Sequence, residues 1–419
     1  MRVSLVSTGE EILRGEVLDT NAALAAAKLD ARGFALVRRH TCGDGLDGIR
    51  ETLELALAEA DAVIVCGGLG PTADDRTAEA LARALGVALE TDQDLLRAIE
   101  ARFASLGIPF TPNQARQARL PAGAESIENR AGTAPGISAR SEGGAQVFCL
   151  PGPPLEYRSM LEDRVLPELE SLRAKQGESA VFARRVLRVF GRGEGAVEDA
   201  LGDLESEVPG LELGFRAALP EIHLKLRARA DTGERAEELI EQAAKLARAR
   251  LGADLFSEHD RSLPECVVEA LIARGLTLAA AESCTGGLLG KLVTDVPGAS
   301  ETFLLSAVTY ANQAKQDVLG VEADLLREHG AVSAECAQAM ARGVRRIAKA
   351  DIGLSTTGIA GPTGGSTDKP VGTVFVGLST SEGTTARKLR FPPRDRDFIR
   401  RLAAHAALDL LRREVLLEA

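Results

Sequence analysis

The sequence predicts an α/β protein of more than one domain. Its 419 residues exceed what one ordinary hydrophobic core accommodates, so two or three domains are expected. Short apolar runs alternate with amphipathic stretches in the first part of the chain and again in the last, and this rhythm is typical of strands joined by helices. The pattern changes in between. We therefore expect a parallel-sheet domain at residues 1–175, a small α+β module at 176–257 and a sheet with helices on both faces (α/β/α) at 258–419.

The composition excludes several classes of protein. A hydrophobic content of 45% and a charged content of 26% are typical of a soluble globular protein. The formal net charge of -11 argues against a general nucleic-acid binder, which needs a basic surface. The first residues are too acidic for a signal peptide, and no apolar run approaches the ~20 residues of a membrane span. The six cysteines show no metal-binding spacing, so we expect a cytoplasmic protein with reduced thiols. From the charge and the lack of a long apolar run, we expect neither nucleic acid nor a membrane as a partner.

The first domain alternates strands and helices from its beginning. The predicted strands are residues 3–7, 35–41 and 62–66, and the predicted helices are residues 21–32, 46–58 and 76–85. In parallel sheets the loops at the carboxyl ends of the strands carry the ligand site. The loop after residue 66 contains Gly67, Gly68 and Gly70, which allow a ligand to approach the backbone closely. Asp74 and Asp75 follow: Asp74 is either the N-cap of the next helix or a ligand-binding group, and Asp75 either interacts favourably with the helix dipole or also binds the ligand.

These loops resemble those of a known family. The Gly67-Gly68-Leu69-Gly70 turn looks like that of the molybdopterin-binding fold, and further motifs are similar to the N-terminal domain of the CinA family. Those motifs are Thr8-Gly9-Glu10-Glu11, Asp19-Thr20-Asn21, Gly132-Thr133-Ala134-Pro135-Gly136 and Leu150-Pro151-Gly152-Pro153-Pro154. The resemblance implies a metal-dependent ADP-ribose pyrophosphatase domain, in which Asp74 and Asp75 would bind Mg²⁺ or a similar divalent ion. The nucleotide contacts that it implies are Glu10, Asp19, Asn21, Gly67, Gly68, Gly70, Asn113 and Gly152.

The middle of the chain predicts a smaller module. The predicted strands are residues 186–190, 211–215 and 222–228, and the predicted helices are residues 196–204 and 235–251. The CinA resemblance implies a KH-like fold here. Residues 181–255 hold 12 basic against 14 acidic residues and no Gly-x-x-Gly loop, so nucleic-acid binding is not expected. We interpret the module as a spacer or a dimerisation element, and we expect a homodimer.

Three polar constellations follow predicted strands in the last domain. The predicted strands are residues 277–281, 302–310, 352–357, 371–379 and 386–391, and the predicted helices are residues 264–274, 334–348 and 397–411. The constellations lie at residues 283–287, 309–315 and 355–365. Each combines hydroxyl or amine side chains with backbone N–H groups. The third is rich in glycine and could enclose a ribose phosphate.

Two side chains of the first constellation are possible nucleophiles, Ser283 and Cys284. A serine needs a base to attack at neutral pH, and no histidine occurs in the three constellations. A lysine can serve if burial lowers its pKa. Lys315, close to Tyr310 and Asn312 in the sequence, is the candidate base; the alternative is an ordinary solvated lysine. Cys284 is either the rival nucleophile or a small buried residue that supports the turn.

The motifs of this domain resemble the CinA C-terminal domain, which is similar to nicotinamide-nucleotide amidohydrolase. They are Ala281-Glu282-Ser283-Cys284-Thr285-Gly286-Gly287, Val308-Thr309-Tyr310-x-Asn312-x-x-Lys315, Gly330-Ala331-Val332-Ser333, Gly358-Ile359-Ala360-Gly361-Pro362 and Lys369-Pro370-Val371-Gly372-Thr373. The resemblance implies a serine amidase that converts nicotinamide mononucleotide (NMN) and water to nicotinate mononucleotide and ammonia. It implies no metal or cofactor for this step.

The resemblance also implies a role for each residue. Ser283 attacks the carboxamide, Lys315 is its base and Tyr310 helps to position the proton path. The N–H groups from Thr285 through Gly286 to Gly287 would form the oxyanion hole. Arg396 would hold the 5′-phosphate together with the third constellation, and Arg400 either assists or is a surface charge. The other expected substrate contacts are Gly287, Asn312, Gly358, Ala360, Gly361 and Thr373.

The resemblance therefore implies an NMN deamidase of pyridine-nucleotide recycling, bifunctional with an ADP-ribose pyrophosphatase in the first domain. The expected partners are small-molecule nucleotides, NMN and ADP-ribose. The alternative is a non-catalytic, nucleotide-binding interaction protein with a role in competence.

Overall fold

A computed structural model of the protein describes residues 1–175 and 181–417. The chain divides into two compact units, Met1–Phe182 with Ala230–Gly233, and Ala183–Arg229 with Glu234–Ala419. The predicted boundary between residues 175 and 176 lies beside residues 176–180, which are outside the described residues, as are residues 418 and 419. Within the described ranges, none of the helices has both the length and the apolar character that crossing a membrane requires.

The first unit contains a six-stranded sheet in the order β2-β1-β3-β8-β7-β6. Its strands are β1 (Arg2–Thr8), β2 (Ala35–Cys42), β3 (Ala62–Cys66), β6 (Glu125–Ile127), β7 (Gly136–Arg140) and β8 (Gln146–Leu150). The first four strands in this order are parallel, as predicted. β7 and β6 are antiparallel, so one edge of the sheet differs from the expected parallel arrangement.

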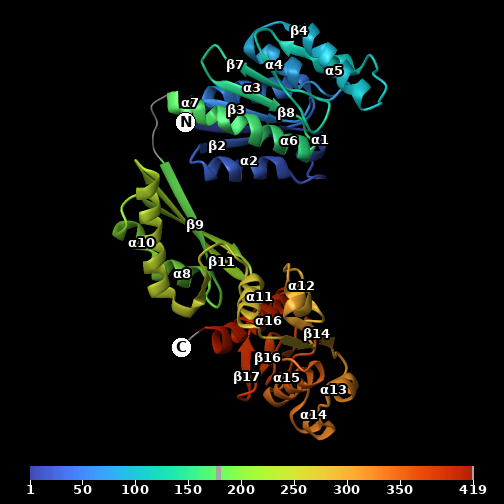
Figure 1. Cartoon of the computed structure of the whole chain (residues 1–419), viewed down its shortest axis with the longest axis vertical. Helices are drawn as coiled ribbons and strands as arrows, with labels where there is room; N and C mark the ends of the chain where they lie inside the picture. The colour runs from blue at the N-terminus through green and yellow to red at the C-terminus, as the bar shows by residue number, and fades with distance from the viewer. Residues whose placement is uncertain (176–180, 418–419) are drawn as a thin grey trace. The chain divides into compact units, whose positions relative to one another are not determined.

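Helices cover both faces of this sheet (Figure 1). They are α1 (Glu10–Leu13), α2 (Thr20–Ala31), α3 (Leu46–Glu59), α4 (Thr77–Leu85), α5 (Gln93–Ser105), α6 (Pro154–Met160) and α7 (Leu166–Lys175). The short elements β4 (Leu89–Thr91), η1 (Gln114–Ala118), β5 (Arg119–Pro121) and η2 (Leu161–Val165) complete the domain. Successive strand residues point to opposite faces, so Leu5 packs with α2, α6 and α7, while Val6 packs with α3 and α4.

The middle module is a four-stranded sheet in the order β10-β11-β9-β12 with helices packed against it. Its elements are β9 (Val181–Val189), α8 (Glu194–Leu201), α9 (Leu204–Glu207), β10 (Leu211–Ala218), β11 (Glu221–Ala230), α10 (Gly233–Leu251), η3 (Gly252–Asp254) and β12 (Leu255–Ser257). The order of strands and helices agrees with the predicted small α+β module. The short strand β12 was not predicted.

The last domain is built on a five-stranded sheet in the order β14-β13-β15-β16-β17. Its strands are β13 (Leu278–Glu282), β14 (Phe303–Val308), β15 (Ile352–Gly358), β16 (Thr373–Ser379) and β17 (Thr384–Arg390). β14, β13 and β15 are parallel, whereas β16 and β17 are antiparallel to their neighbours. The three parallel strands therefore end at the same edge, where the three polar constellations follow them.

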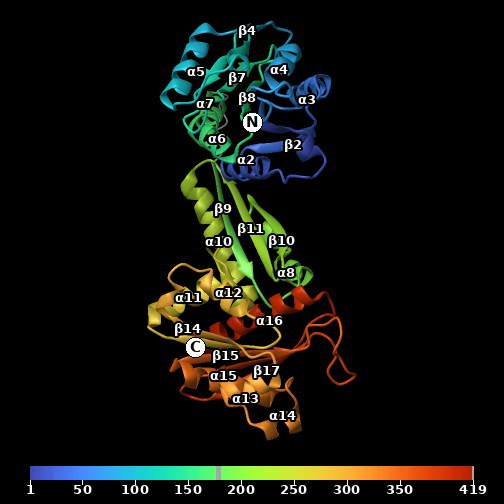
Figure 2. The same ribbon diagram turned by 90° about the vertical axis from the view of Figure 1, so that its right-hand side faces the viewer.

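Two helical layers enclose this sheet, as Figure 2 shows. The helices are α11 (Leu263–Arg274), α12 (Leu288–Thr294), α13 (Asn312–Leu319), α14 (Ala323–His329), α15 (Ala334–Ala348) and α16 (Arg396–Leu411), with η4 (Ala299–Glu301) and η5 (Arg412–Leu416). α11, α12 and α16 share one apolar core with the sheet. α13, α14 and α15 share the other.

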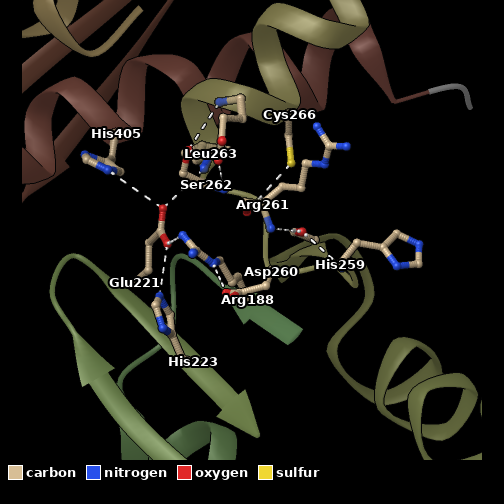
Figure 3. Close-up of polar contacts among 12 residues, drawn as sticks. Arg188, Glu221, His223, His259, Asp260, Arg261, Ser262, Leu263, Cys266 and His405 are labelled. Carbon is tan, nitrogen blue, oxygen red and sulfur yellow. Dashed lines mark hydrogen bonds and ion pairs between the residues drawn. The ribbon is translucent and has the colours of Figure 1, made fainter. Parts of the chain in front are cut away.

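A buried carboxylate joins the middle module to the last domain (Figure 3). Glu221, the first residue of β11, is 5% exposed. Its carboxylate accepts the backbone N–H of Leu263 at 3.3 Å and lies 3.2 Å from the guanidinium of Arg188. The imidazoles of His223 and His405 lie 3.5 and 3.9 Å from it. Ionisable groups from three elements thus meet at this junction.

Candidate functional site

The turn after β13 is anchored to the end of the neighbouring strand. The N–H of Ser283 donates to the carbonyl of Thr356 at 2.9 Å, and the hydroxyls of Thr285 and Thr356 lie 2.7 Å apart. The left-handed backbone of Gly286 and Gly287, with φ of 59° and 94°, then leads the chain into α12. Ser283 itself stays partly accessible. The strand, turn and helix predicted around this residue are therefore present.

Cys284 is buried behind this turn, with 4% of its surface exposed. Burial raises the pKa of its thiol to about 12, because a thiolate loses its hydration there. A thiol that stays protonated at neutral pH is a poor nucleophile. Of the two nucleophiles that the sequence left open, the geometry favours Ser283.

Lys315 is 1% exposed, although it lies on the short helix α13. Its Nζ lies 3.2 Å from the Ser283 Oγ, 2.9 Å from the Thr309 carbonyl oxygen and 3.0 Å from the Tyr310 carbonyl oxygen. Burial lowers the pKa of this lysine. The interpretation of Lys315 as a solvated surface lysine is therefore wrong.

The backbone amides of the turn do not match the expected oxyanion hole. The N–H of Gly286 donates to the Ser283 carbonyl, and that of Gly287 to the Glu282 carboxylate at 2.9 Å. Two of the three expected donors, the amides of Gly286 and Gly287, are therefore already engaged inside the protein. The N–H groups of Cys284 and Thr285 have no oxygen acceptor among the described residues, and that of Cys284 faces only its own thiol.

Arg396 connects two of the constellations. Its Nη2 donates to the Tyr310 hydroxyl at 2.6 Å and its Nη1 to the Gly361 carbonyl at 2.8 Å. Tyr310 is 58% exposed, so this bridge lies at the surface. A guanidinium has five donors, and three of its hydrogens remain available to an anion beside the glycine-rich loop.

The other expected substrate contacts differ in accessibility. Asn312 is exposed at the first position of α13. Ala360 is buried, and a side chain at Gly358 would collide with the Thr373 carbonyl at 2.8 Å, so these positions shape the loop by close packing. The hydroxyl of Thr373 donates to the Pro370 carbonyl at 2.7 Å and closes the loop.

Arg400 has a role that neither sequence interpretation included. Its Nε and Nη2 donate to the carbonyl oxygen of Thr285 at 3.1 and 2.7 Å. The side chain therefore fixes the turn that carries Ser283. The spacing of four residues from Arg396 was visible in the sequence, but the acceptor was not.

A second site lies in the first unit, in a pocket of about 510 Å³. It is formed at the carboxyl ends of β1, β3 and β8, where ligand sites of such sheets occur. The predicted residues that line it are Asp19, Asn21, Gly67, Gly68, Gly70, Asp74, Asp75 and Gly152. The close approach of its turns requires glycine: a side chain at Gly67, whose φ is 103°, would lie 2.8 Å from the Thr8 carbonyl.

Two of these residues, Asp19 and Asn21, fix the position of α2 at the edge of the pocket. Asp19 caps α2 through the N–H of Ala22 at 2.9 Å and accepts the Ser7 hydroxyl at 2.6 Å. The amide of Asn21 donates to the Gly152 carbonyl at 2.7 Å and thereby ties α2 to the loop after β8.

Two predicted contacts lie elsewhere. The Glu10 carboxylate pairs with Arg14 at 2.9 Å, and Asn113 is exposed before η1, so neither lines the pocket. Gln117, which the sequence did not single out, does line it. This residue is 8% exposed, and its Oε1 has no hydrogen-bond partner among the described residues.

The two aspartates of the pocket suit a metal ion that is held jointly by the protein and a bound phosphate, rather than by protein ligands alone. α4 begins at Thr77 with Arg76 as its N-cap, so the interpretation of Asp74 as a cap is wrong. Asp75 accepts the N–H and the hydroxyl of Thr72 at 2.8 and 2.5 Å, while Asp74 is exposed. The described residues contain no group of three His, Cys, Asp or Glu placed to hold a metal ion. Mg²⁺ often uses one or two carboxylates together with ligand phosphates, and these residues fit that arrangement.

Comparison with known proteins assigns a family to each part of the chain. Residues 4–171 match the probable molybdopterin binding domain, residues 184–257 the damage-inducible protein CinA KH domain and residues 260–415 the CinA C-terminal domain. A CinA-like protein of Desulfosudis oleivorans is 43% identical over 99% of this chain and 100% of its own length. A CinA-like protein of Geobacter sulfurreducens is 44% identical over 99% and 100%.

Among solved structures, the protein CinA of Thermoplasma acidophilum is 36% identical over 40% of this chain and 96% of that chain, with a TM-score of 0.37. The relatives that match over their full length determine the family. The chain belongs to the family of CinA-like proteins, with a molybdopterin-binding-like first domain, a KH-like middle domain and a CinA C-terminal domain.

Proposed function

We propose that the protein is an NMN amidohydrolase whose nucleophile is Ser283 and whose base is Lys315. The observation that carries the proposal is the position of the Lys315 amine, which is buried between two carbonyl oxygens and the Ser283 hydroxyl. A neutral amine has two hydrogens and one lone pair. The two carbonyls accept the hydrogens, and the lone pair is left to accept the proton of the serine.

In the acylation half of the reaction, Ser283 Oγ attacks the carboxamide carbon and its proton moves to Lys315 Nζ. The amide oxygen becomes an oxyanion, and the free N–H groups of Cys284 and Thr285 are its donors. When the C–N bond breaks, Lys315 returns the proton to the leaving nitrogen, and ammonia departs. The serine then carries a nicotinoyl ester.

Water completes the reaction. Lys315 removes a proton from the water as its oxygen attacks the ester carbonyl, and Ser283 regains a proton as the C–O bond breaks. The products are nicotinate mononucleotide and the free enzyme. Arg396 and the loop that begins at Gly361 would hold the 5′-phosphate, because a guanidinium matches phosphate oxygens two at a time.

The test is ammonia release from NMN by the full chain in the presence of EDTA. We expect turnover with the chelator, since no step needs a metal. Ser283→Ala should reduce kcat by at least about 10³-fold, as in other enzymes that lose a nucleophile. Cys284→Ala should keep most of the activity. The proposal is abandoned if Ser283→Ala retains full activity while Cys284→Ala loses it.

We propose a second activity, metal-dependent cleavage of ADP-ribose, for the pocket of the first unit. Its volume of about 510 Å³ lies within the range of small-molecule sites, and Asp74 offers an exposed carboxylate beside a glycine-rich turn. A divalent ion shared with the pyrophosphate would neutralise part of its charge. Release of AMP from ADP-ribose that requires added Mg²⁺ or Mn²⁺ would support the activity. A chain inactive on both substrates would leave the non-catalytic, nucleotide-binding role.

A further inference from the structure

The residue that precedes the nucleophile is a fully buried acid. Glu282 ends β13, a strand whose five residues are all buried, and it has 0% of its surface exposed. A carboxylate in such a place is costly unless hydrogen bonds replace its hydration. Its partners therefore indicate what the surrounding structure is built to do.

The carboxylate of Glu282 accepts four hydrogen bonds, and none of the donors is a cation. Oε2 accepts the N–H groups of Gly287 at 2.9 Å and Leu289 at 3.0 Å. Oε1 accepts the N–H of Gly290 and the hydroxyl of Ser306, both at 2.8 Å. Two bonds to each oxygen fill the acceptor capacity of the group. One side chain thus ties the start of α12 to β13 and to the neighbouring strand β14.

The packing around this carboxylate tolerates no extra atom. A side chain at Gly290 would place its Cβ 2.8 Å from the Ser306 Oγ and 3.3 Å from the Glu282 Oε1. Real Cβ atoms do not approach so closely without a shift of their neighbours. α12 therefore reaches the carboxylate only because residue 290 is glycine.

These bonds decide which amides of the turn remain free. Glu282 takes the N–H groups of residues 287, 289 and 290, and backbone carbonyls take those of residues 283, 286 and 288. The amides of Cys284 and Thr285, the two residues that follow Ser283, are left without an oxygen acceptor among the described residues. We propose that Glu282 is a positioning residue, which holds the turn so that these two amides meet the oxyanion of the acyl-transfer step. This inference rests on the proposed amidase function.

The first test compares three variants of the full chain on NMN. Glu282→Gln keeps the size of the side chain but turns one acceptor oxygen into a donor that opposes a backbone N–H. We expect kcat to fall by at least ~10-fold with KM changed less than ~3-fold, since a lost oxyanion donor costs ~10²–10³ in kcat. Ser306→Ala, which removes one of the four bonds, should give a smaller fall in the same direction.

Asp351→Asn is the matched control. The Asp351 carboxylate accepts the N–H and the hydroxyl of Thr277 at 2.9 and 2.7 Å, just before the opposite end of β13. Its loss should lower the melting temperature without changing kcat. An equal kcat in Glu282→Gln and Asp351→Asn, both measured where the proteins are folded, overturns the positioning role. If Glu282→Gln does not fold, an unchanged kcat in Ser306→Ala overturns it.

A second test does not depend on NMN. An alkyl fluorophosphonate reacts with an activated serine: the Oγ–P bond forms, the P–F bond breaks, fluoride leaves and the proton goes to Lys315. The adduct at Ser283 is followed by mass spectrometry. We expect Glu282→Gln to slow labelling at least ~10-fold, because the phosphonyl oxygen uses the same donors.

The two tests separate the two proposals. A native chain that is labelled at Ser283 but releases no ammonia from NMN contradicts the substrate, and the labelling rates still decide the role of Glu282. Equal labelling rates in native and Glu282→Gln chains overturn the positioning role alone. A native chain that neither releases ammonia from NMN nor is labelled overturns both.

Discussion

The state of a single amine, Lys315, determines what the candidate active site can do. The carbonyls of Thr309 and Tyr310 accept hydrogen bonds from both the protonated and the neutral amine, so they favour neither form. Burial favours the neutral form, because the charged form loses its hydration and the pKa of Lys315 therefore falls. The neutral amine is the form that can accept the proton of Ser283.

A pH profile tests this argument. Only deprotonated Lys315 acts as a base, so kcat/KM should rise with pH and level off above the lysine pKa. Because burial lowers that pKa, the midpoint of the rise should lie below the ~10.4 of an ordinary lysine. Lys315→Arg should be inactive at every pH, since a guanidinium stays protonated. A midpoint at or above pH 10.4, or activity in the arginine variant, contradicts the role of the lysine.

Residue types and the family resemblance pointed to Ser283 and Lys315, but the environment of these two residues could not be predicted. The absence of histidine near the turn and the presence of a lysine after the next strand indicated Lys315 as the candidate base, while Ser283 and Cys284 both remained possible nucleophiles until the family resemblance favoured Ser283. The choice between Ser283 and Cys284 required burial, which a sequence of small residues does not reveal. The free amides could not be predicted either, because Glu282 takes competing donors through contacts across two strands.

At the scale of elements, α16 links the site to the rest of its domain. Arg396 and Arg400 lie four residues apart and therefore on the same side of the helix. Arg396 holds the surface bridge between Tyr310 and Gly361, whereas Arg400 holds the carbonyl of Thr285 in the turn. The helix thus presents one arginine to the expected phosphate and the other to the nucleophile turn.

The two arginines should differ in kinetics. Arg396→Met should raise KM for NMN by ~10–100-fold, since a hydrogen bond to a charged group contributes about 1.5–3 kcal/mol. Arg400→Met should lower kcat and leave KM within ~3-fold, because it loosens the turn and not the phosphate contact. Steady-state assays on NMN measure both. A larger KM effect in the Arg400 variant would assign that residue to the phosphate instead.

The elements themselves were predicted where periodicity is strong. The strands that carry the site, β13 and β15, lie where apolar runs predicted them, and parallel pairing brings their ends together. The antiparallel edge formed by β6 and β7 was missed because no strand was predicted there, and the antiparallel direction of β16 and β17 was not predicted because an apolar run indicates a strand but not its direction. β14 ends at Val308, two residues earlier than predicted, and this frees the carbonyls of Thr309 and Tyr310 for the lysine.

For the whole molecule, the two candidate sites belong to different compact units, so a substitution in one site should remove its activity without affecting the other. Asp74→Asn should abolish metal-dependent cleavage of ADP-ribose and leave NMN deamidation unchanged, because this carboxylate has no part in the amidase site. Ser283→Ala should give the reverse pattern. Both activities are measured on the same preparations of full chain, with and without EDTA. Loss of both activities in either variant contradicts the assignment of separate sites.

The junction of the middle module with the last domain should respond to acid. His405 and His223 face the Glu221 carboxylate, and Arg188, paired with Asp260 at 2.9 Å, completes the group. Burial lowers the pKa of both imidazoles, because each would lose hydration as a cation. The folded junction therefore binds fewer protons than the unfolded chain once the pH falls below the ~6.5 of an ordinary histidine.

The stability of this junction should consequently be complete above pH ~6.5 and decline as the pH falls through the window down to the lowered pKa values. Each histidine contributes a slope of at most about 1.4 kcal/mol per pH unit. Hydrogen exchange of amides in α16 and β11, measured on the full chain from pH 5 to 8 and corrected for intrinsic rates, reports the opening free energy. His405→Asn should flatten its pH dependence, whereas His329→Asn, on the exposed end of α14, should not. An unchanged slope in the His405 variant would mean that this imidazole takes up no proton when the junction opens, and the acid sensitivity would then belong to His223 alone.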